Sequence, residues 1–353
     1  MLPTLRSAIR RKLARWYQTN KRDLPWRRSH DPYAIWISET MLQQTQVNTV
    51  IPYYKNFLDR FPTVDALARA PLPQVLRFWS GLGYYRRAAN LKQAAQQIVR
   101  RHGGEMPQDF TELRALAGIG DYTAGALLSI AFGKPYPAID GNVRRVLSRL
   151  LRITDERELR AMAAELVPAK RPGEFNQALM ELGATICTPK KQRCSHCPMN
   201  SLCAGRSSPD AAVLGARTPV KFKTVVWPMA IVHRGGKILL RRRPANGLLA
   251  GLWELPGQEL TGRDSIAGLF KRELNGVALS GARSKKLGDI RHAITYRLIR
   301  APVYIFEFMA KSRINLPPSQ WRWVAPAKLR AHAVSSMTAK AVALFATDEK
   351  NLR

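Results

Sequence analysis

The chain has 353 residues, more than one hydrophobic core usually holds, and 46% of them are hydrophobic, so two packed domains are expected. Its formal net charge of +32 indicates a polyanion partner, nucleic acid before acidic lipid, with a generally basic solvated surface as the plain alternative. No apolar run approaches the roughly 20 residues that span a bilayer, and no cleavable leader is visible, so we expect a soluble protein without a membrane partner.

The first stretch, Met1 to Arg22, is basic and contains no acid, as in a mitochondrial transit peptide. Apolar side chains nevertheless recur in it at helical spacing, which favours a first amphipathic helix of the fold. These are Leu5, Ile9, Leu13 and Trp16. Helical patterns with short Pro- or Gly-marked connections continue to about Cys203, so the sequence predicts an all-α domain over residues 1–203.

Glu39 lies on one of these predicted helices, among mostly apolar neighbours at helical spacing. The neighbours are Ile35, Trp36, Leu42 and Gln43. A carboxyl group in such surroundings is poorly solvated, which raises its pKa and lets it hold a proton near neutral pH. A solvated surface position is the commoner interpretation of a helical glutamate taken alone.

Two glycines, Gly118 and Gly120, stand between helical stretches, with small residues after them. They allow a tight turn whose backbone N–H groups, with the start of the next helix, can hold a phosphate. An ordinary connection between two helices would show the same pattern. Asp140 follows, immediately before another helical run. It can cap that helix and stay ionised there, because the positive end of a helix favours a carboxylate.

All four cysteines fall between positions 187 and 203. They are Cys187, Cys194, Cys197 and Cys203. Their clustering indicates one metal-type site rather than disulfides, because we expect a cytosolic chain. Four thiolates suit structural zinc or an iron–sulfur cluster, and the spacing alone leaves both open. Lys190, Lys191 and Arg193 lie in the first interval, so either metal would fix a basic loop for phosphate contact.

The spacing of the cysteines resembles the [4Fe–4S] loop in the endonuclease III and MutY branch of the helix-hairpin-helix DNA glycosylases. The glycine turn resembles that family's hairpin, and the stretch from Ser38 to Val47 closely resembles the MutY signature. The resemblance implies a [4Fe–4S] cluster with a structural and DNA-positioning role. It also implies double-stranded DNA with a mispaired adenine as partner, a monomeric protein, and a cytoplasmic location with the bacterial nucleoid.

The resemblance further implies roles for single residues. Glu39 would protonate adenine at N7 and then activate water, while Asp140 would stabilise the positive deoxyribose left behind. Bifunctional relatives carry an attacking lysine where this chain has Tyr122. A phenol cannot form a Schiff base, so base removal without coupled strand cleavage is expected. Asn142 and Tyr122 would complete the hydrogen bonding around the two carboxyl groups.

Other positions match family residues that open the duplex or line the adenine pocket. Gln44 and Tyr84 match residues that wedge into the base stack, although a surface amide and a core tyrosine are equally ordinary interpretations. The predicted pocket positions are Trp26, Arg27, Leu42 and Glu181.

Residues 204–218 are small, polar and Pro-containing, which predicts an exposed linker before a second domain at residues 219–353. The period of the apolar pattern changes there, and the domain is predicted to be α+β. The expected elements are a hairpin of Val225 to Val232 and Ile238 to Arg241, strands at Ile294 to Ile299 and Val303 to Phe308 on either side of Ala301 and Pro302, and a closing helix from Ser335 to Ala346.

The stretch from Met229 to Gly257 resembles the opening of a Nudix-type domain. Nucleoside-diphosphate hydrolysis is not expected, because Glu273 is not followed by the clustered glutamates that bind divalent metal. In MutY proteins this domain inspects the base opposite the adenine, 8-oxoguanine, with a Phe-Ser-His loop. The matching residues here are Ile294, Thr295 and Tyr296, of which Thr295 keeps a hydroxyl group.

Two other functions fit part of the pattern. A thymine-removing mismatch glycosylase shares the hairpin, tyrosine and aspartate, but Glu39 and the second domain argue against it. A non-catalytic DNA-damage binding protein would not need both Glu39 and Asp140. The sequence therefore predicts a monofunctional adenine DNA glycosylase of base excision repair, acting opposite 8-oxoguanine or guanine. Its expected fold is an all-α helix-hairpin-helix domain with an iron–sulfur loop, followed by an α+β Nudix-like domain.

Overall fold

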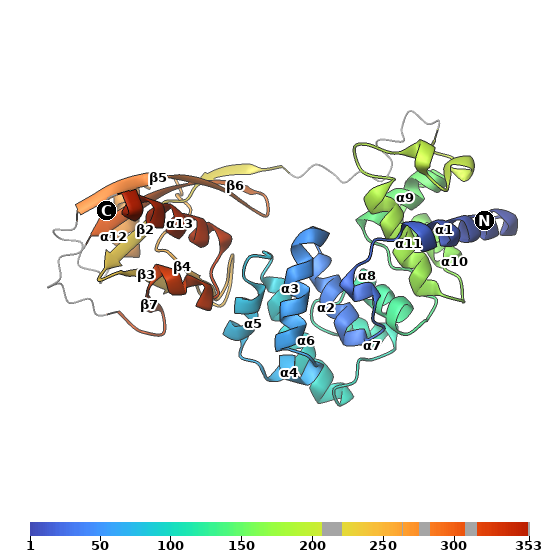
Figure 1. Ribbon diagram of the computed structural model, residues 1–353, viewed down its shortest axis with the longest axis horizontal. Helices are drawn as coiled ribbons and strands as arrows, with labels where there is room; N and C mark the ends of the chain where they lie inside the picture. Colours follow the sequence, from blue (N-terminus) through green and yellow to red (C-terminus); the bar gives the residue numbers. More distant parts are fainter. Residues whose placement is uncertain (207–220, 263, 275–282, 308–315, 352–353) are drawn as a thin grey trace. The chain divides into compact units, whose positions relative to one another are not determined.

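The computed structural model describes residues 1–206, 221–262, 264–274, 283–307 and 316–351 (Figure 1). Packing divides the chain into two compact units, Met1–Arg69 with Asn90–Thr218 and Ala70–Ala89 with Pro219–Arg353. The predicted linker lies outside the described residues from position 207 onward. Within the described ranges, no helix combines the length and apolar character needed to cross a bilayer.

The first unit is helical, as the sequence predicted. Its elements are α1 (Pro3–Asn20), η1 (Pro25–Arg27), α2 (Pro32–Leu42), α3 (Val47–Arg60), α4 (Val64–Arg69), most of α6 (Arg86–His102), α7 (Phe110–Arg114), α8 (Asp121–Ala126), η2 (Leu127–Ala131), α9 (Gly141–Leu151), α10 (Glu156–Leu166), α11 (Pro172–Thr185), η3 (Cys194–His196) and η4 (Asn200–Leu202).

Two helices show how the apolar pattern builds this unit. The predicted amphipathic helix is confirmed as α1, which buries Ile9 and Leu13 in a core shared with α9, α10 and α11. Helix α2 begins where Asp31 accepts hydrogen bonds from the first backbone N–H groups of the helix. Every residue of α2 from Tyr33 to Met41 is buried, so a carboxyl group on this helix is held away from water.

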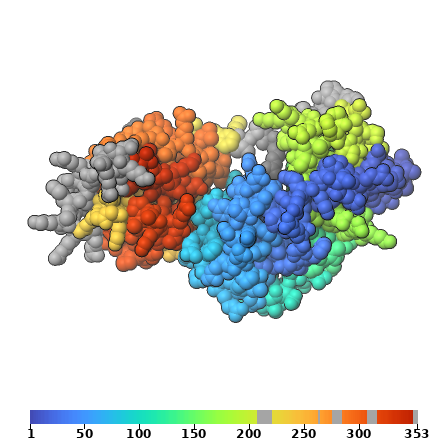
Figure 2. Space-filling view, in the orientation of Figure 1, coloured from blue at the N-terminus to red at the C-terminus, as the bar shows by residue number. Residues whose placement is uncertain are grey.

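The second unit contains a seven-stranded mixed sheet with the order β1-β6-β2-β3-β4, with β5 paired to β6 and β7 to β3. Its elements are α5 (Leu72–Trp79), β1 (Lys223–Val226), β2 (Met229–Arg234), β3 (Lys237–Arg242), β4 (Trp253–Glu254), α12 (Ile266–Glu273), β5 (Arg283–Ile294), β6 (Arg297–Glu307), β7 (Trp321–Val324), η6 (Pro326–Ala331) and α13 (Ser336–Asn351). Figure 2 shows residues of β5 and β6, in orange, at the molecular surface.

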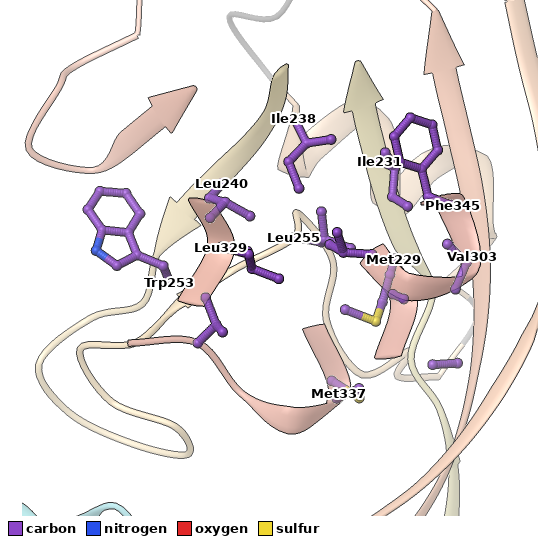
Figure 3. Close-up of a cluster of buried hydrophobic side chains, with 14 of the residues drawn as sticks. Met229, Ile231, Ile238, Leu240, Trp253, Leu255, Val303, Leu329, Met337 and Phe345 are labelled. Atoms are coloured by element: carbon purple, nitrogen blue, oxygen red, sulfur yellow. The ribbon is translucent and has the colours of Figure 1, made fainter. Parts of the chain in front are cut away.

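Helices cover both faces of this sheet. On one face, α13 contributes Met337 and Phe345 to a core with Met229, Ile231 and Val303 (Figure 3). On the other face, Phe270 and Leu274, within and just after α12, pack on the even-numbered side chains of β2 and β6. The predicted α+β architecture and the closing helix are therefore confirmed.

Two predicted strand boundaries in this unit are wrong. The run from Val225 to Val232 is two strands, because Trp227 and Pro228 separate β1 from β2 and proline has no N–H group for a ladder. The run from Ile294 to Ile299 crosses the turn between β5 and β6 at Thr295 and Tyr296. Pro302 lies inside β6 rather than breaking it. It falls between the residues of β6 that pair with β1 and those that pair with β2, where a missing N–H group costs no ladder bond.

Residues 70–89, which contain α5, pack with the second unit although they lie far from it in the sequence. The Ser80 hydroxyl donates a hydrogen bond to the backbone oxygen of Val334 at 2.8 Å, and the Tyr85 hydroxyl donates to the same oxygen at 3.1 Å. Packing thus divides the chain differently from the contiguous ranges 1–203 and 219–353. Sequence pattern alone cannot show such a division, because the apolar pattern of a short helix is the same whichever neighbour the helix packs against.

Candidate active site and cysteine cluster

Helix α2 of the first unit carries a buried acid. Glu39, on α2, is 5% exposed and accepts a short hydrogen bond from the Tyr122 hydroxyl. Burial raises the pKa of Glu39 to about 7, against the hydrogen bond from Tyr122, which lowers it, and with the nearby charge of Asp140, which raises it. The poorly solvated position that the sequence predicted for Glu39 is thus confirmed. Glu39 can carry a transferable proton at neutral pH.

Tyr122 lies in the first turn of α8, directly after the glycine turn. Burial raises its pKa well above the ordinary tyrosine value, and the charges of Glu39 and Asp140 raise it further. Its hydroxyl therefore stays protonated and serves as a hydrogen-bond donor to Glu39. Gly118 has a left-handed backbone (φ 77°), and an added Cβ would come within 2.7 Å of the Asn90 Cβ, so the turn requires glycine there.

Asp140 caps α9, as one interpretation of the sequence proposed. One carboxylate oxygen accepts from the backbone N–H groups of Asn142 at 2.9 Å and Val143 at 2.7 Å. The other accepts from the Asn142 side-chain amide at 2.8 Å. These three donors fix the position of the carboxylate at the start of α9. The site therefore combines one acid that keeps a proton and one carboxylate held by donors, a pairing suited to acid and electrostatic catalysis.

Arg145, buried on α9, connects this carboxylate to the cysteine loop. Its guanidinium donates to the Asn142 side-chain oxygen at 2.8 Å, to the Gly183 backbone oxygen at 2.7 Å and to the Cys187 backbone oxygen at 2.8 Å. An added Cβ on Gly183 would come within 2.6 Å of the Asn142 Cβ, so glycine lets α11 approach α9 here. The position of Asn142 beside Asp140 thus depends on contacts that reach the first cysteine.

The four cysteines line one cavity of about 160 Å³, together with Arg149 and Arg193. Arg149 donates to the Cys187 sulfur at 3.4 Å and to the Thr188 backbone oxygen at 2.9 Å. Among the described residues, no three Cys, His, Asp or Glu side chains converge closely enough to hold a single metal ion. Four thiols around one cavity, with an arginine donating to one sulfur, are a donor set that suits zinc or an iron–sulfur cluster. Lys190, Lys191 and Arg193 are exposed on this loop.

Two of the predicted pocket residues, Arg27 and Glu181, meet at a second buried carboxylate. Glu181, on α11, accepts from Arg22 at 2.7 Å and from Arg27 at 2.8 Å. Burial raises the pKa of Glu181, but the two arginines outweigh burial and hold it below its ordinary value. Trp26 is buried and packs edge-on against Tyr54, with ring centroids 5.5 Å apart. Leu42 is partly exposed at the end of α2.

The two predicted wedge residues share an uncommon backbone. Gln44, just after α2, has φ 58°, and Tyr84, just before α6, has φ 47°. Both side chains are exposed. Left-handed conformations in residues other than glycine cost free energy and cluster at functional positions. Gln44 belongs to the first unit and Tyr84 to the second.

Comparisons with known proteins give the family of the chain. Residues 37–169 match the HhH-GPD superfamily of base excision DNA repair proteins, and residues 228–344 match the NUDIX domain. The human adenine DNA glycosylase is 34% identical over 96% of this chain and 74% of its own length. The rat adenine DNA glycosylase is 35% identical over 96% of this chain and 78% of its length. The chain belongs to the adenine DNA glycosylases. It is a DNA N-glycosylase of base excision repair, and DNA is its partner.

Solved structures agree with the helical fold of this adenine DNA glycosylase. A thermostable thymine-DNA glycosylase has a TM-score of 0.55 and 30% identity, and the match covers 57% of this chain and 97% of that one. A trapped endonuclease III–DNA covalent intermediate has a TM-score of 0.51 and 23% identity over 58% of this chain and 98% of that one, which shows the fold alone.

Sequence reasoning missed three arginines of this adenine DNA glycosylase. Arg145 and Arg149 are both buried, and Arg22 pairs with Glu181. A signal for the first two was present, because they are spaced by four residues on the helix that Asp140 begins. Their side chains therefore lie on one face of α9, among the apolar residues of its buried side.

Proposed function

We propose that this adenine DNA glycosylase removes adenine opposite 8-oxoguanine or guanine, without cutting the strand. The hydrogen-bonded pair of Glu39 and Tyr122 carries the proposal, because it combines a buried proton donor with a phenol in place of an amine nucleophile. Asp140, held by three donors, supplies a fixed negative charge for the sugar.

The proposed reaction breaks the bond between adenine and deoxyribose. Glu39 gives its proton to N7 of the flipped adenine, so the base leaves as a neutral molecule rather than as an anion. The bonding electrons leave with the base, and Asp140 stabilises the oxocarbenium ion that remains. Glu39, now a carboxylate, accepts a proton from the attacking water, whose oxygen bonds to C1′. The products are free adenine and an abasic site, and Glu39 is protonated again.

We expect the strand to break only after alkali. A duplex with adenine opposite 8-oxoguanine should lose its adenine, and gel electrophoresis should show cleavage after hot alkali but not in untreated samples. Borohydride should trap little enzyme on the DNA. Matched duplexes with adenine opposite guanine and thymine opposite guanine define the substrate. Direct nicking together with efficient trapping would contradict a monofunctional reaction, and release of thymine alone would favour the thymine glycosylase instead.

The cysteine cavity supports a [4Fe–4S] cluster held by Cys187, Cys194, Cys197 and Cys203. When bound, the cluster would supply rigidity to this loop rather than chemistry at the sugar. Arg149 would donate to one of its sulfur ligands, and Arg145 would hold Asn142 against the backbone of the same loop. The exposed side chains of Lys190, Lys191 and Arg193 would then contact phosphates from a fixed position.

We expect protein purified without oxygen to be brown and to contain about four iron atoms per chain. Metal analysis and the visible absorption spectrum measure this directly. Cys197→Ser should lower iron content and duplex affinity before it lowers the rate of the chemical step. Stoichiometric zinc without iron would overturn the cluster.

The turn between β5 and β6 supports contact with the opposite base. Thr295 has φ 53°, a conformation that β-branched residues rarely adopt, and its hydroxyl donates to the Ile294 backbone oxygen at 2.7 Å. The Ile294 side chain packs on the core of the sheet, so the exposed contacts of this turn belong to Thr295 and Tyr296. A strained turn with an exposed hydroxyl is suited to reading one polar group.

We expect Thr295→Ala to lower the preference for 8-oxoguanine over guanine opposite adenine by about ten- to a hundred-fold, the worth of one specific hydrogen bond to a base. Single-turnover rates and affinities on both duplexes at one salt concentration measure the preference. Thr295→Ser, which keeps the hydroxyl, is the matched control. Equal preference in Thr295→Ala and the original protein would remove this turn from lesion recognition.

A further inference from the structure

Among the described residues, no helix covers one end of the large sheet in the second unit on the face where α12 packs. Helix α12 has 8 residues and covers the part of this face that carries Tyr304 and Phe306 of β6. Side chains alternate along a strand, so Leu298 and Arg300 lie on the same face toward the other end of β6. Both are exposed, whereas Ile299 on the opposite face is buried.

This uncovered end has three strands, and its register places two arginines directly opposite each other. Arg291 of β5 pairs with Arg300 of β6, and Ala293 pairs with Leu298. On the other side of β6, Thr224 of β1 pairs with Leu298. Like charges directly opposite each other destabilise an antiparallel pair. An anion that binds between the two guanidinium groups reduces this repulsion.

The charges around the two arginines are not balanced. Asp289 pairs with Arg300 at 3.4 Å and also with Lys286 at 2.8 Å, so one carboxylate is shared by two cations. The Arg291 side chain forms no ion pair with any described residue. On the opposite face, Glu259 is likewise shared by two cations, Lys223 at 3.0 Å and Arg297 at 2.9 Å. Arg291 is thus the cation that the uncovered face carries in addition.

Exposed apolar side chains border this basic strip. Phe222 is 56% exposed, Tyr296 45% and Leu298 44%, and they are three of the six large exposed apolar residues in the described part of the chain. The backbone N–H of Lys223 donates to the Tyr296 oxygen at 2.8 Å, which fixes the start of β1 beside the turn. Apolar side chains beside the guanidinium groups of Arg291 and Arg300 suit a nucleic-acid backbone, whose sugars are apolar and whose phosphates are charged.

We propose that this uncovered face binds the phosphate backbone of duplex DNA, with Arg291 and Arg300 on phosphates and Phe222 and Leu298 against the sugars. The inference rests on the proposed function only in taking duplex DNA as the ligand. The face would contact DNA of any sequence, whereas the turn at Thr295 would contact one base. The two contacts therefore differ in what they contribute, affinity from the face and discrimination from the turn.

The test is the salt dependence of duplex binding by the full-length protein. Fluorescence anisotropy with an undamaged duplex and with one carrying adenine opposite 8-oxoguanine gives the affinity at several salt concentrations. Each phosphate contact contributes about 0.9 to the slope of log affinity against log salt, so the double variant Arg291→Gln, Arg300→Gln should lower the slope by about 2 for both duplexes. Asp289→Asn, which removes the competing carboxylate, should tighten binding.

Two controls make the result decisive. Arg242→Gln removes an exposed arginine of β3 on the same unit and should leave the slope unchanged. The double variant Arg291→Lys, Arg300→Lys keeps the charge and should keep most of the slope, which separates lost contacts from misfolding. An unchanged slope in the glutamine variant would overturn the proposal. The proposal would also be overturned if the glutamine variant bound an acidic peptide more weakly than the original protein but bound DNA equally well. The face would then serve a protein partner.

Excision measured in the same samples keeps this result separate from the proposed function. At saturating enzyme, the glutamine variant should release adenine at the original rate, since the altered residues lie outside the first unit. If the unaltered protein releases no adenine, the proposed function fails, and the slope on undamaged duplex still decides whether the face binds DNA.

Discussion

We expect Glu39→Gln to slow adenine release by about a hundred- to ten-thousand-fold, the usual contribution of a general acid. The glutamine keeps the size of the side chain and an oxygen that can accept the hydrogen bond from Tyr122, but it has no proton to transfer. Duplex affinity should stay unchanged, because no phosphate contact is lost. Single-turnover excision with saturating enzyme, beside anisotropy on the same duplex, measures both quantities.

The control for this variant is Glu112→Gln, which alters an exposed helical carboxylate and should leave the rate as it was. An excision rate within a few-fold of the original protein for Glu39→Gln would remove Glu39 from the chemistry. Loss of duplex binding would instead assign Glu39 a structural role.

The pH dependence of the excision rate is an independent test of the role of Glu39. Burial raises the pKa of Glu39 to about 7, and the protonated form is the active one. The single-turnover rate should therefore hold below pH 7 and fall as the pH rises through it, by about tenfold per unit. Tyr122→Phe removes the hydrogen bond that lowers this pKa, so the fall should move to higher pH. A fall that moves to lower pH would contradict the assigned contact.

We expect Asp140→Asn to slow the release of adenine by about a hundred- to a thousand-fold, the usual cost of losing one fixed group that stabilises charge in the transition state. The amide oxygen can still accept from the backbone N–H groups that begin α9, so the fold and duplex binding should persist. The negative charge facing the sugar is lost. Single-turnover rates and thermal unfolding of the same preparation test the two halves of this expectation.

Asp109→Asn is the matched control, because Asp109 caps α7 in the same way but lies exposed and outside the site. The two variants should lose similar stability, typically below about 2 kcal/mol for a cap, and only the variant at position 140 should lose activity. Near-normal excision by Asp140→Asn would leave Asp140 as a cap and nothing more.

Particular residues show which structural features can be predicted from the sequence. The helical pattern of α1, the burial of Glu39 and the capping position of Asp140 all follow from local spacing, and the structure has each of them. Strand boundaries around Pro228 and the turn at Thr295 were predicted wrongly. At both places the outcome depends on which strand pairs with which, and a local apolar run carries no information about its partner.

The sequence by itself determined the family, the two-part fold and the local positions of Glu39, Asp140 and the four cysteines, because each depends on residue types at fixed local spacing. Only the tertiary structure decided that Tyr122 donates to Glu39 and that Arg145 joins Asn142 to the cysteine loop. It alone also set Arg291 against Arg300 on an uncovered face. The physical reason is the same for all three. Hydrogen bonds, pKa shifts and charge repulsion depend on distances between residues far apart in the chain, and these distances exist only after helices and strands have packed.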